Sequence, residues 1–159
     1  MATKAVKPIP DGYHSVTPYI VCKGAAKAID WYRNVFGAEE LMRMEGAPGT
    51  IAHAEIKIAD SVVMMADEHP DMGARSPEAF GGTPVGFMIY LKDCDAVFKK
   101  AVDAGAKADR PLADQFYGDR SGSVIDPFGH KWTIATHIED IPPEEMGKRH
   151  DEWMAKQKK

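Results

Sequence analysis

The fold of this chain is decided by a stretch that occurs twice: residues 25–39 read AAKAIDWYRNVFGAE, and residues 96–107 read AVFKKAVDAGAK. In both copies alanine and larger apolar residues recur at helical spacing, which predicts an amphipathic helix. Each helix then meets a glycine, Gly37 or Gly105, of the kind that ends helices in the left-handed conformation. The two halves of the chain therefore look like two copies of one supersecondary unit.

Strands are predicted on both sides of each helix. The expected strands are residues 14–22, 39–44, 51–58 and 61–66 in the first half, and 85–91, 107–111, 121–125 and 131–136 in the second. Each half therefore has the order β-α-β-β-β. One such unit would leave a sheet face bare, so two should pack together with helices on their convex faces. The sequence predicts an α+β fold in which two facing curved sheets form a cup.

The remaining segments complete a single domain of residues 1–159. Residues 67–84 are rich in Gly, Pro and Ser and read as a linker or mobile flap between module one, about residues 14–66, and module two, about residues 85–137. Residues 142–159 have early glutamates and late lysines, which suits the dipole of a C-terminal helical arm.

Composition excludes several classes of function. The net charge is −4 and the basic residues are scattered, which disfavours nucleic acid as a partner. Cys22 and Cys94 lie far apart in no metal-like spacing, as expected of reduced thiols. No run approaches the roughly 20 apolar residues of a membrane span, and residues 1–10 lack the apolar core of a signal peptide. We therefore expect a cytoplasmic protein without a membrane partner.

Several short motifs carry a family resemblance. They are Thr17-Pro18-Tyr19, Ala28-Ile29-Asp30-Trp31-Tyr32, Phe36-Gly37-Ala38, His53-Ala54-Glu55, and residues 114–120 followed by Asp126-Pro127-Phe128-Gly129-His130-x-Trp132. With the doubled β-α-β-β-β order, they resemble the vicinal oxygen chelate superfamily of glyoxalase I, bleomycin-resistance proteins and extradiol dioxygenases, and within it the PhnB-like branch. The block from Gln115 to Trp132 is the most specific. The resemblance implies a homodimer as the usual assembly.

The resemblance also implies where a divalent metal would bind, on the first and last strands of each unit. Counting from the helices and the Asp-Pro-Phe-Gly turn places these positions at Thr17, Met64 or Met65, Phe87 and Thr133. A neutral hydroxyl is a poor ligand, and thioether and phenyl groups do not hold a hard cation. We therefore expect no bound metal and no cofactor.

Other side chains indicate a small-molecule pocket. His53 and Glu55 share one face of a strand, and His53 is a candidate base. Residues 114–120 combine aromatic rings, an amide, acids and an arginine, as pockets for small molecules do. Arg120 can bind a carboxylate or phosphate, or instead pair with Asp119 to structure the loop. The candidate ligand-binding residues are Thr17, Tyr19, His53, Met64, Phe87, Gln115, Phe116, Tyr117, Arg120 and Thr133; the candidate catalytic residues are His53 and Glu55.

Trp132, on the last strand, and His137, at the end of that strand, are predicted to have structural roles. Strand alternation from Thr133 places Trp132 in the helix-covered core. His137 is expected to pair with an acid at residues 139–140.

Three functions remain open. The first is a metal-independent protein that binds a small organic molecule; pliable methionines at 42, 44, 64 and 65 favour it. The second is a lyase, isomerase or dioxygenase-type enzyme that uses acid–base chemistry or an atypical metal site around His53 and Glu55. The third is a regulatory or assembly role for the C-terminal arm.

Overall fold

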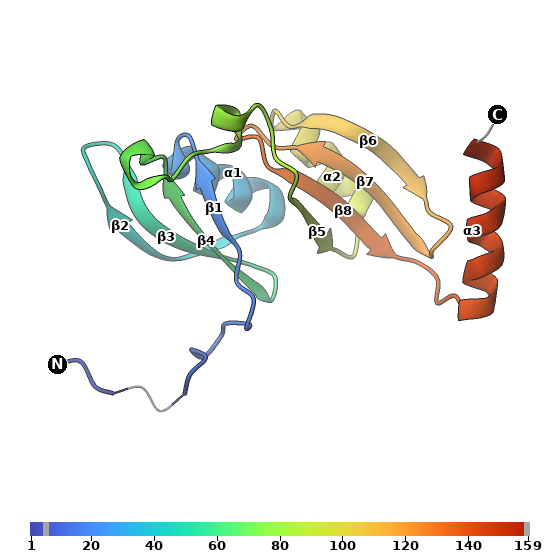
Figure 1. The fold of residues 1–159 in the computed structure, drawn as a ribbon, viewed down its shortest axis with the longest axis horizontal. Helices are drawn as coiled ribbons and strands as arrows, with labels where there is room; N and C mark the ends of the chain where they lie inside the picture. Colours follow the sequence, from blue (N-terminus) through green and yellow to red (C-terminus); the bar gives the residue numbers. More distant parts are fainter. Residues whose placement is uncertain (5–6, 158–159) are drawn as a thin grey trace. The chain divides into compact units, whose positions relative to one another are not determined.

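The computed structural model describes residues 1–4 and 7–157 (Figure 1). The chain forms two compact units, Met1–Gly82 and Thr83–Lys159, hereafter the first and the second unit. Each unit contains a four-stranded sheet and a helix in contact with its strands. This confirms the α+β class and the duplicated order. The cup between the sheets and the single domain of residues 1–159 stay predictions.

The first unit has the predicted β-α-β-β-β order. Its elements are β1 (Tyr19–Cys22), α1 (Ala25–Phe36), β2 (Glu39–Glu45), β3 (Ile51–Ile58) and β4 (Ser61–Asp67), followed by the short 3-10 helices η1 (Pro70–Met72) and η2 (Pro77–Phe80). The sheet order is β1-β4-β3-β2, with β1 parallel to β4 and the other pairs antiparallel. The segment predicted as a linker or flap thus contains two helical turns.

The first strand begins at Tyr19, five residues later than predicted. Pro18 has no N–H to donate, and its carbonyl oxygen accepts a hydrogen bond from the Met64 N–H at 2.9 Å. Before it, the Thr17 hydroxyl donates to the His14 carbonyl oxygen at 3.1 Å, which forms a turn rather than a strand. The segment ahead of β1 is therefore not part of the sheet, and several of its residues line a hollow of the first unit.

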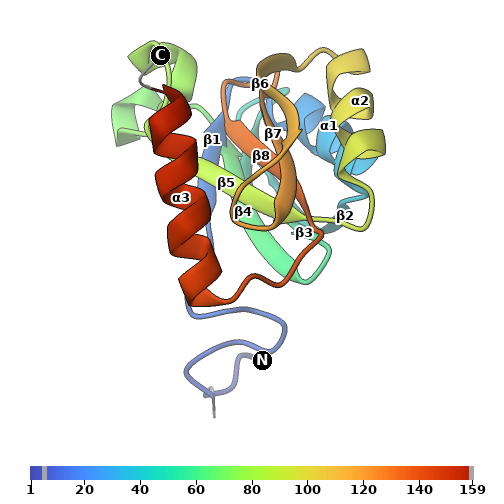
Figure 2. The same cartoon turned by 90° about the vertical axis from the view of Figure 1, so that its right-hand side faces the viewer.

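The second unit repeats the topology and adds a helix. Its elements are β5 (Gly86–Tyr90), α2 (Cys94–Asp103), β6 (Lys107–Asp114), β7 (Asp119–Ile125), β8 (Lys131–His137) and α3 (Pro143–Gln157). The sheet order is β5-β8-β7-β6. Figure 2 shows α3 as a separate helix that follows β8. The predicted arm is therefore helical through Gln157, while residues 158–159 lie outside the described residues. No helix in the described ranges is long and apolar enough to cross a bilayer.

Strand alternation gives the first sheet one apolar face. Ile20, Ala54, Ile56 and Met65 are buried on the face that carries α1. The helix presents Ala28, Ile29, Tyr32 and other apolar side chains at the spacing that makes one buried stripe, and it ends at Gly37 with φ 68°. Because successive strand residues point to opposite faces, the other face of this sheet carries Tyr19, His53, Glu55 and Met64.

The second sheet has a similar buried face but corrects one prediction. Trp132 is 4% exposed, which confirms that it belongs to the core, together with Val124 and Ile134. Phe87 lies opposite Trp132 in the register of β5 and β8, with ring centroids 4.9 Å apart, whereas Met88 lies opposite Thr133. The prediction that Phe87 shares the face of Thr133 is wrong, because an error of one residue in a strand's register reverses its faces.

Candidate functional site

The first unit joins two tyrosines, a histidine and a glutamate by hydrogen bonds. Tyr19 Oη lies 3.0 Å from His53 Nδ1, and His53 Nε2 lies 3.2 Å from Glu55 Oε1. The other carboxylate oxygen of Glu55 accepts a hydrogen bond from the Tyr13 hydroxyl. The candidate catalytic pair His53 and Glu55 is therefore in contact, and each member also has a phenolic partner.

The strand register explains how these side chains meet. Tyr19 on β1 and Glu55 on β3 both lie opposite Met64 on β4, so the three residues form one row across the sheet. His53 lies two residues before Glu55 and therefore points to the same face. This confirms that His53 and Glu55 share one sheet face, and the register adds Tyr19 and Met64 to that face. Their binding of a ligand stays a prediction.

Glu55 is a buried carboxylate that stays ionised at neutral pH. The residue is only 8% exposed to solvent. The hydrogen bond from Tyr13 lowers the pKa of Glu55 most, burial opposes this, and the contact with His53 lowers it further. The same hydrogen bond to Glu55 raises the pKa of Tyr13. Because an ionised carboxylate only accepts hydrogen bonds, His53 Nε2 carries the proton in its contact with Glu55, and a neutral His53 accepts from Tyr19 at Nδ1.

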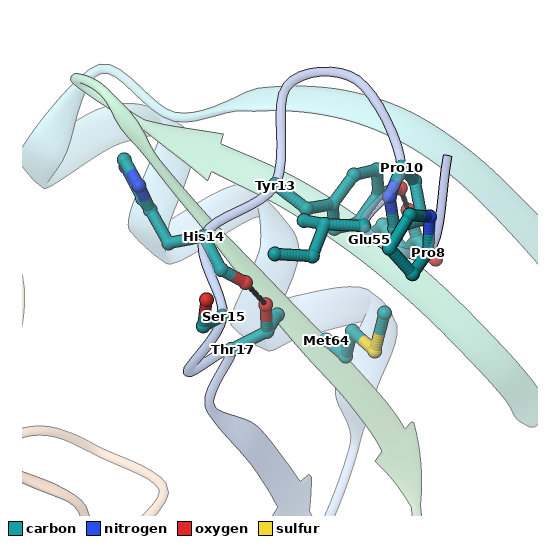
Figure 3. A pocket seen from close by; sticks show the side chains of 9 residues that line it. Pro8, Pro10, Tyr13, His14, Ser15, Thr17, Glu55 and Met64 are labelled. Carbon is teal, nitrogen blue, oxygen red and sulfur yellow. Dashed lines mark hydrogen bonds between the residues drawn. The ribbon is translucent and has the colours of Figure 1, made fainter. Parts of the chain in front are cut away.

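A hollow of about 360 Å³ lies beside this group in the first unit (Figure 3). Its lining residues are Pro8, Ile9, Pro10, Tyr13, His14, Ser15, Thr17, Glu55 and Met64. In Figure 3, Tyr13, Pro8 and Pro10 gather around Glu55, while Thr17 and Met64 lie further along the hollow. Most of the wall thus comes from the segment ahead of β1. Sequence reasoning did not find Tyr13 or the prolines, because that segment has no periodicity and its contact with Glu55 spans 42 residues.

Arg120 of the second unit is already engaged. Its Nε and one terminal nitrogen donate to the two carboxylate oxygens of Asp95 at 2.7 and 2.8 Å, and its other terminal nitrogen donates to Asp114 at 3.0 Å. Such a bidentate pair uses the fork that a ligand carboxylate or phosphate would need. The structural alternative is therefore favoured for Arg120, although its partners are Asp95 and Asp114 rather than the predicted Asp119.

The loop before β7 contacts α3. The ring of Phe116 lies 5.3 Å from that of Tyr117 and 5.6 Å from those of His150 and Trp153, measured between centroids. The Gln115 amide donates to the carbonyl oxygens of residues 113 and 121 at 3.2 and 3.4 Å. These contacts give the loop a role in holding the arm, and ligand binding by Gln115, Phe116 and Tyr117 stays a prediction.

The second unit has a polar group of its own, which the sequence revealed only in part. Asp119, only 3% exposed, accepts a hydrogen bond from the Tyr90 hydroxyl at 2.8 Å and contacts His137 Nδ1 at 2.8 Å. His137 Nε2 lies 2.9 Å from Asp140 Oδ1, which confirms the predicted pairing of His137 with a following acid. Thr133 Oγ1 lies 3.1 Å from Ser123 Oγ on the same sheet.

The two acids around His137 predict a pH-dependent contribution to stability. Hydrogen bonds first to Asp140 and then to Asp119 raise the pKa of His137 above its ordinary 6.5. A histidine whose pKa is higher in the folded state stabilises the protein fully below the unfolded pKa, and this contribution disappears as the pH rises through the folded pKa. We expect urea unfolding to show a stability difference between wild type and His137→Gln that shrinks from about pH 5.5 to about pH 9.

His69→Gln serves as the control, because His69 is an exposed histidine in the first unit. Its difference from wild type should change little over the same range. A His137→Gln difference that is constant or grows with pH contradicts the prediction.

Comparisons with known proteins agree with this fold. The sequence profile of the Glyoxalase/Bleomycin resistance protein/Dioxygenase superfamily matches residues 12–134. The Mycobacterium tuberculosis protein Rv0887c is 40% identical over 135 residues, which cover 83% of this chain and 79% of that protein. The crystal structure of TioX from Micromonospora sp. ML1 has a TM-score of 0.60 and 28% identity, covering 79% of this chain and 99% of TioX. The PhnB protein from Bacillus cereus has a TM-score of 0.61 at 18% identity, covering 77% and 99%.

The chain belongs to the Glyoxalase/Bleomycin resistance protein/Dioxygenase superfamily. The likeness to the Bacillus cereus PhnB protein, at 18% identity, shows the fold alone.

The side chains at the superfamily's metal positions do not fit a hard divalent cation. In the first unit the predicted positions are Thr17, which lies ahead of β1, and Met64 on β4; in the second unit the register places Met88 opposite Thr133. These are hydroxyl and thioether groups, whereas such a cation prefers carboxylate, amide or imidazole ligands. Within residues 1–4 and 7–157, no group of three or more His, Cys, Asp or Glu side chains is arranged to hold a metal ion. The donor groups at these four positions are therefore the wrong kind for the superfamily's metal.

Proposed function

We propose that this protein binds a small organic molecule in the hollow of the first unit without the help of a metal ion. The observation that carries the proposal is a hollow of about 360 Å³ whose wall combines apolar groups with an oriented carboxylate and phenol. Its volume lies within the roughly 300–1,000 Å³ of ligand pockets, which typically combine apolar walls with a few oriented polar groups. We also propose a place in the PhnB-like branch, a homodimeric assembly and a cytoplasmic location.

The apolar wall suits a flat or compact ligand. Pro8 and Pro10 restrict the backbone that covers the hollow, which lowers the entropy lost on binding. Met64 lies on the sheet side, and its flexible thioether adapts to ligands of different shape. Tyr13 presents an aromatic ring while its hydroxyl is held by Glu55.

Acid–base catalysis at His53 is the second candidate. One observation favours it: the imidazole is held between Tyr19 and Glu55, as a base is held by the group that orients it. In this reading Glu55 fixes the proton on Nε2, and Nδ1 exchanges a proton with a substrate through the Tyr19 hydroxyl. His53→Gln would then abolish turnover of a bound compound while leaving its affinity within about threefold.

The binding proposal is tested by filling the hollow. The neutral dye N-phenyl-1-naphthylamine, whose fluorescence rises in apolar surroundings, serves as the probe in an equilibrium titration. Met64→Trp places an indole where the ligand would lie, so we expect its affinity for the dye to fall about tenfold or more. Addition of EDTA should leave the wild-type affinity unchanged.

Met72→Trp is the matched control, because Met72 is 79% exposed on η1 and does not line the hollow. It should bind the dye as wild type does. Absence of dye binding, equal affinity of Met64→Trp and wild type, or loss of binding with EDTA overturns the proposal.

A further inference from the structure

The charge on Glu55 has no lysine or arginine paired with it in the described part of the chain. Its contacts are the Tyr13 hydroxyl and His53 Nε2. The Arg33 and Arg43 side chains of the same unit are paired elsewhere, with Glu40. Burying a carboxylate is costly unless it is paired or well hydrogen-bonded. Glu55 is thus a buried anion whose compensation by the protein is limited to a phenol and an imidazole.

The carboxylate still has room for a further donor. Two carboxylate oxygens offer about four lone-pair positions in total. Tyr13 occupies one on Oε2 and His53 occupies one on Oε1. Glu55 is also among the residues that line the hollow, so its remaining acceptor positions are within reach of a ligand there.

The rest of the wall adds to this preference. No lysine or arginine is among the described lining residues, and the neighbours of Glu55 are Tyr13, Pro8 and Pro10 (Figure 3). An aromatic ring attracts a cation over its face, and apolar walls strengthen a charge-assisted hydrogen bond by excluding water. The imidazoles near the hollow are His53, already in contact with Glu55, and the exposed His14 on the wall. A negatively charged ligand would therefore meet the charge of Glu55 with no lysine or arginine on the wall to compensate it.

We propose that the hollow takes an organic cation: an amidinium or ammonium group that donates to Glu55, carried on a small apolar or aromatic body that lies against Met64 and the prolines. This inference rests on the proposed binding function and adds the chemical class of the ligand. It assigns Glu55 the role of charge recognition, with Tyr13 and His53 as the groups that hold its carboxylate in place.

The test uses three probes of nearly the same size and shape: benzamidine, benzamide and benzoate, which are cationic, neutral and anionic. Their affinities are measured by ligand-observed NMR titration at about pH 8, where an ordinary imidazole is neutral. We expect benzamidine to bind at least about tenfold more tightly than either of the other two, because a charge-assisted hydrogen bond to a buried carboxylate is stronger than a neutral one.

Glu55→Gln keeps the shape of the side chain and removes its charge. It should reduce the advantage of benzamidine over benzamide to within about twofold. Glu45→Gln, which makes the same change of net charge at an exposed position of β2, should keep the full preference. Met64→Trp should abolish binding of all three probes.

The outcomes separate this inference from the proposal beneath it. Benzamide or benzoate binding as tightly as benzamidine overturns the inference, as does a failure of benzamidine to bind in the millimolar range. If N-phenyl-1-naphthylamine still binds in a manner sensitive to Met64→Trp, the binding function stands and only the charge preference falls. Should Glu55→Gln not fold, judged by its circular dichroism and melting temperature, the three probes on wild type and Met64→Trp still decide the matter.

Discussion

Replacing Asp126 by alanine should lower the free energy of unfolding by about 3–5 kcal/mol, because three donors, two of them buried, lose their acceptor at once. Asp126 is 3% exposed. Its Oδ1 accepts hydrogen bonds from the Phe128 and His130 backbone N–H groups at 2.9 Å each, and its Oδ2 accepts from Trp132 Nε1 at 3.0 Å. The carboxylate therefore fixes the turn between β7 and β8 and anchors the indole of the core.

Urea unfolding followed by tryptophan fluorescence measures the loss. Asp103→Ala is the matched control, because Asp103 is an exposed residue at the end of α2, and it should change stability by no more than about 0.5 kcal/mol. Trp132→Phe removes one of the three donors and adds a smaller loss from altered packing. If Asp126→Ala costs no more than Asp103→Ala, the turn does not depend on this carboxylate.

The same turn shows what sequence can predict. The block of residues 126–132 belongs to the most specific part of the family resemblance, and its tight turn was expected. Helix α1 was predicted at its observed bounds, because the spacing of its apolar residues and the glycine that ends it, Gly37, are both local features of the sequence. Local patterns of this kind require no knowledge of what lies across the sheet.

The candidate site was predictable where it depends on alternation alone. His53 and Glu55 share a face because they are two residues apart on one strand. Phe87 was assigned to the wrong face because its side depends on the register between β5 and β8, which no residue of β5 specifies by itself. Arg120 was ambiguous for a related reason, since its partner Asp95 lies 25 residues away on α2.

Hydrogen bonds between residues far apart in the chain could not be predicted from the sequence. Tyr13 contacts Glu55 across 42 residues, and Tyr90 contacts Asp119 across 29. A tyrosine is equally at home in a core, on a surface or in a pocket, so neither residue stands out in the sequence. The burial and hydrogen bonds of their acidic partners identify them only once the sheets are known.

The register reveals a correspondence between the units. Tyr19 lies in one row with Met64 and Glu55, and its hydroxyl reaches His53, two residues before Glu55. Tyr90 lies in one row with residues 135 and 121, and its hydroxyl reaches Asp119, two residues before 121. Each unit thus uses a tyrosine on its first strand to hold a polar group on its third. The position of the tyrosine is therefore the same in both units, while the group that its hydroxyl contacts is a histidine in the first and an aspartate in the second.

Asp67→Ala should lower the free energy of unfolding by about 2–4 kcal/mol through the first unit, because its carboxylate also serves three donors. One oxygen accepts from the Gly24 and Ala25 N–H groups at 2.8 and 2.9 Å, and the other accepts from the Ile51 N–H at 2.8 Å. Gly24 has no side chain to cap α1, so Asp67 at the end of β4 supplies the cap. The negative charge of Asp67 also interacts favourably with the positive end of the helix dipole.

Hydrogen exchange provides the local measurement for this variant. The amides of residues 24, 25 and 51 should exchange faster in Asp67→Ala, together with the first turn of α1, because they lose their acceptor directly. Asp67→Asn should be intermediate, since its carbonyl oxygen can keep the helix cap while its NH₂ group faces the Ile51 N–H. Asp71→Ala, at an exposed position of η1, should match wild type. Equal exchange in Asp67→Ala and Asp71→Ala would show that the start of α1 is held by its packed face alone, and that the capping carboxylate contributes nothing to the frame on which the hollow is built.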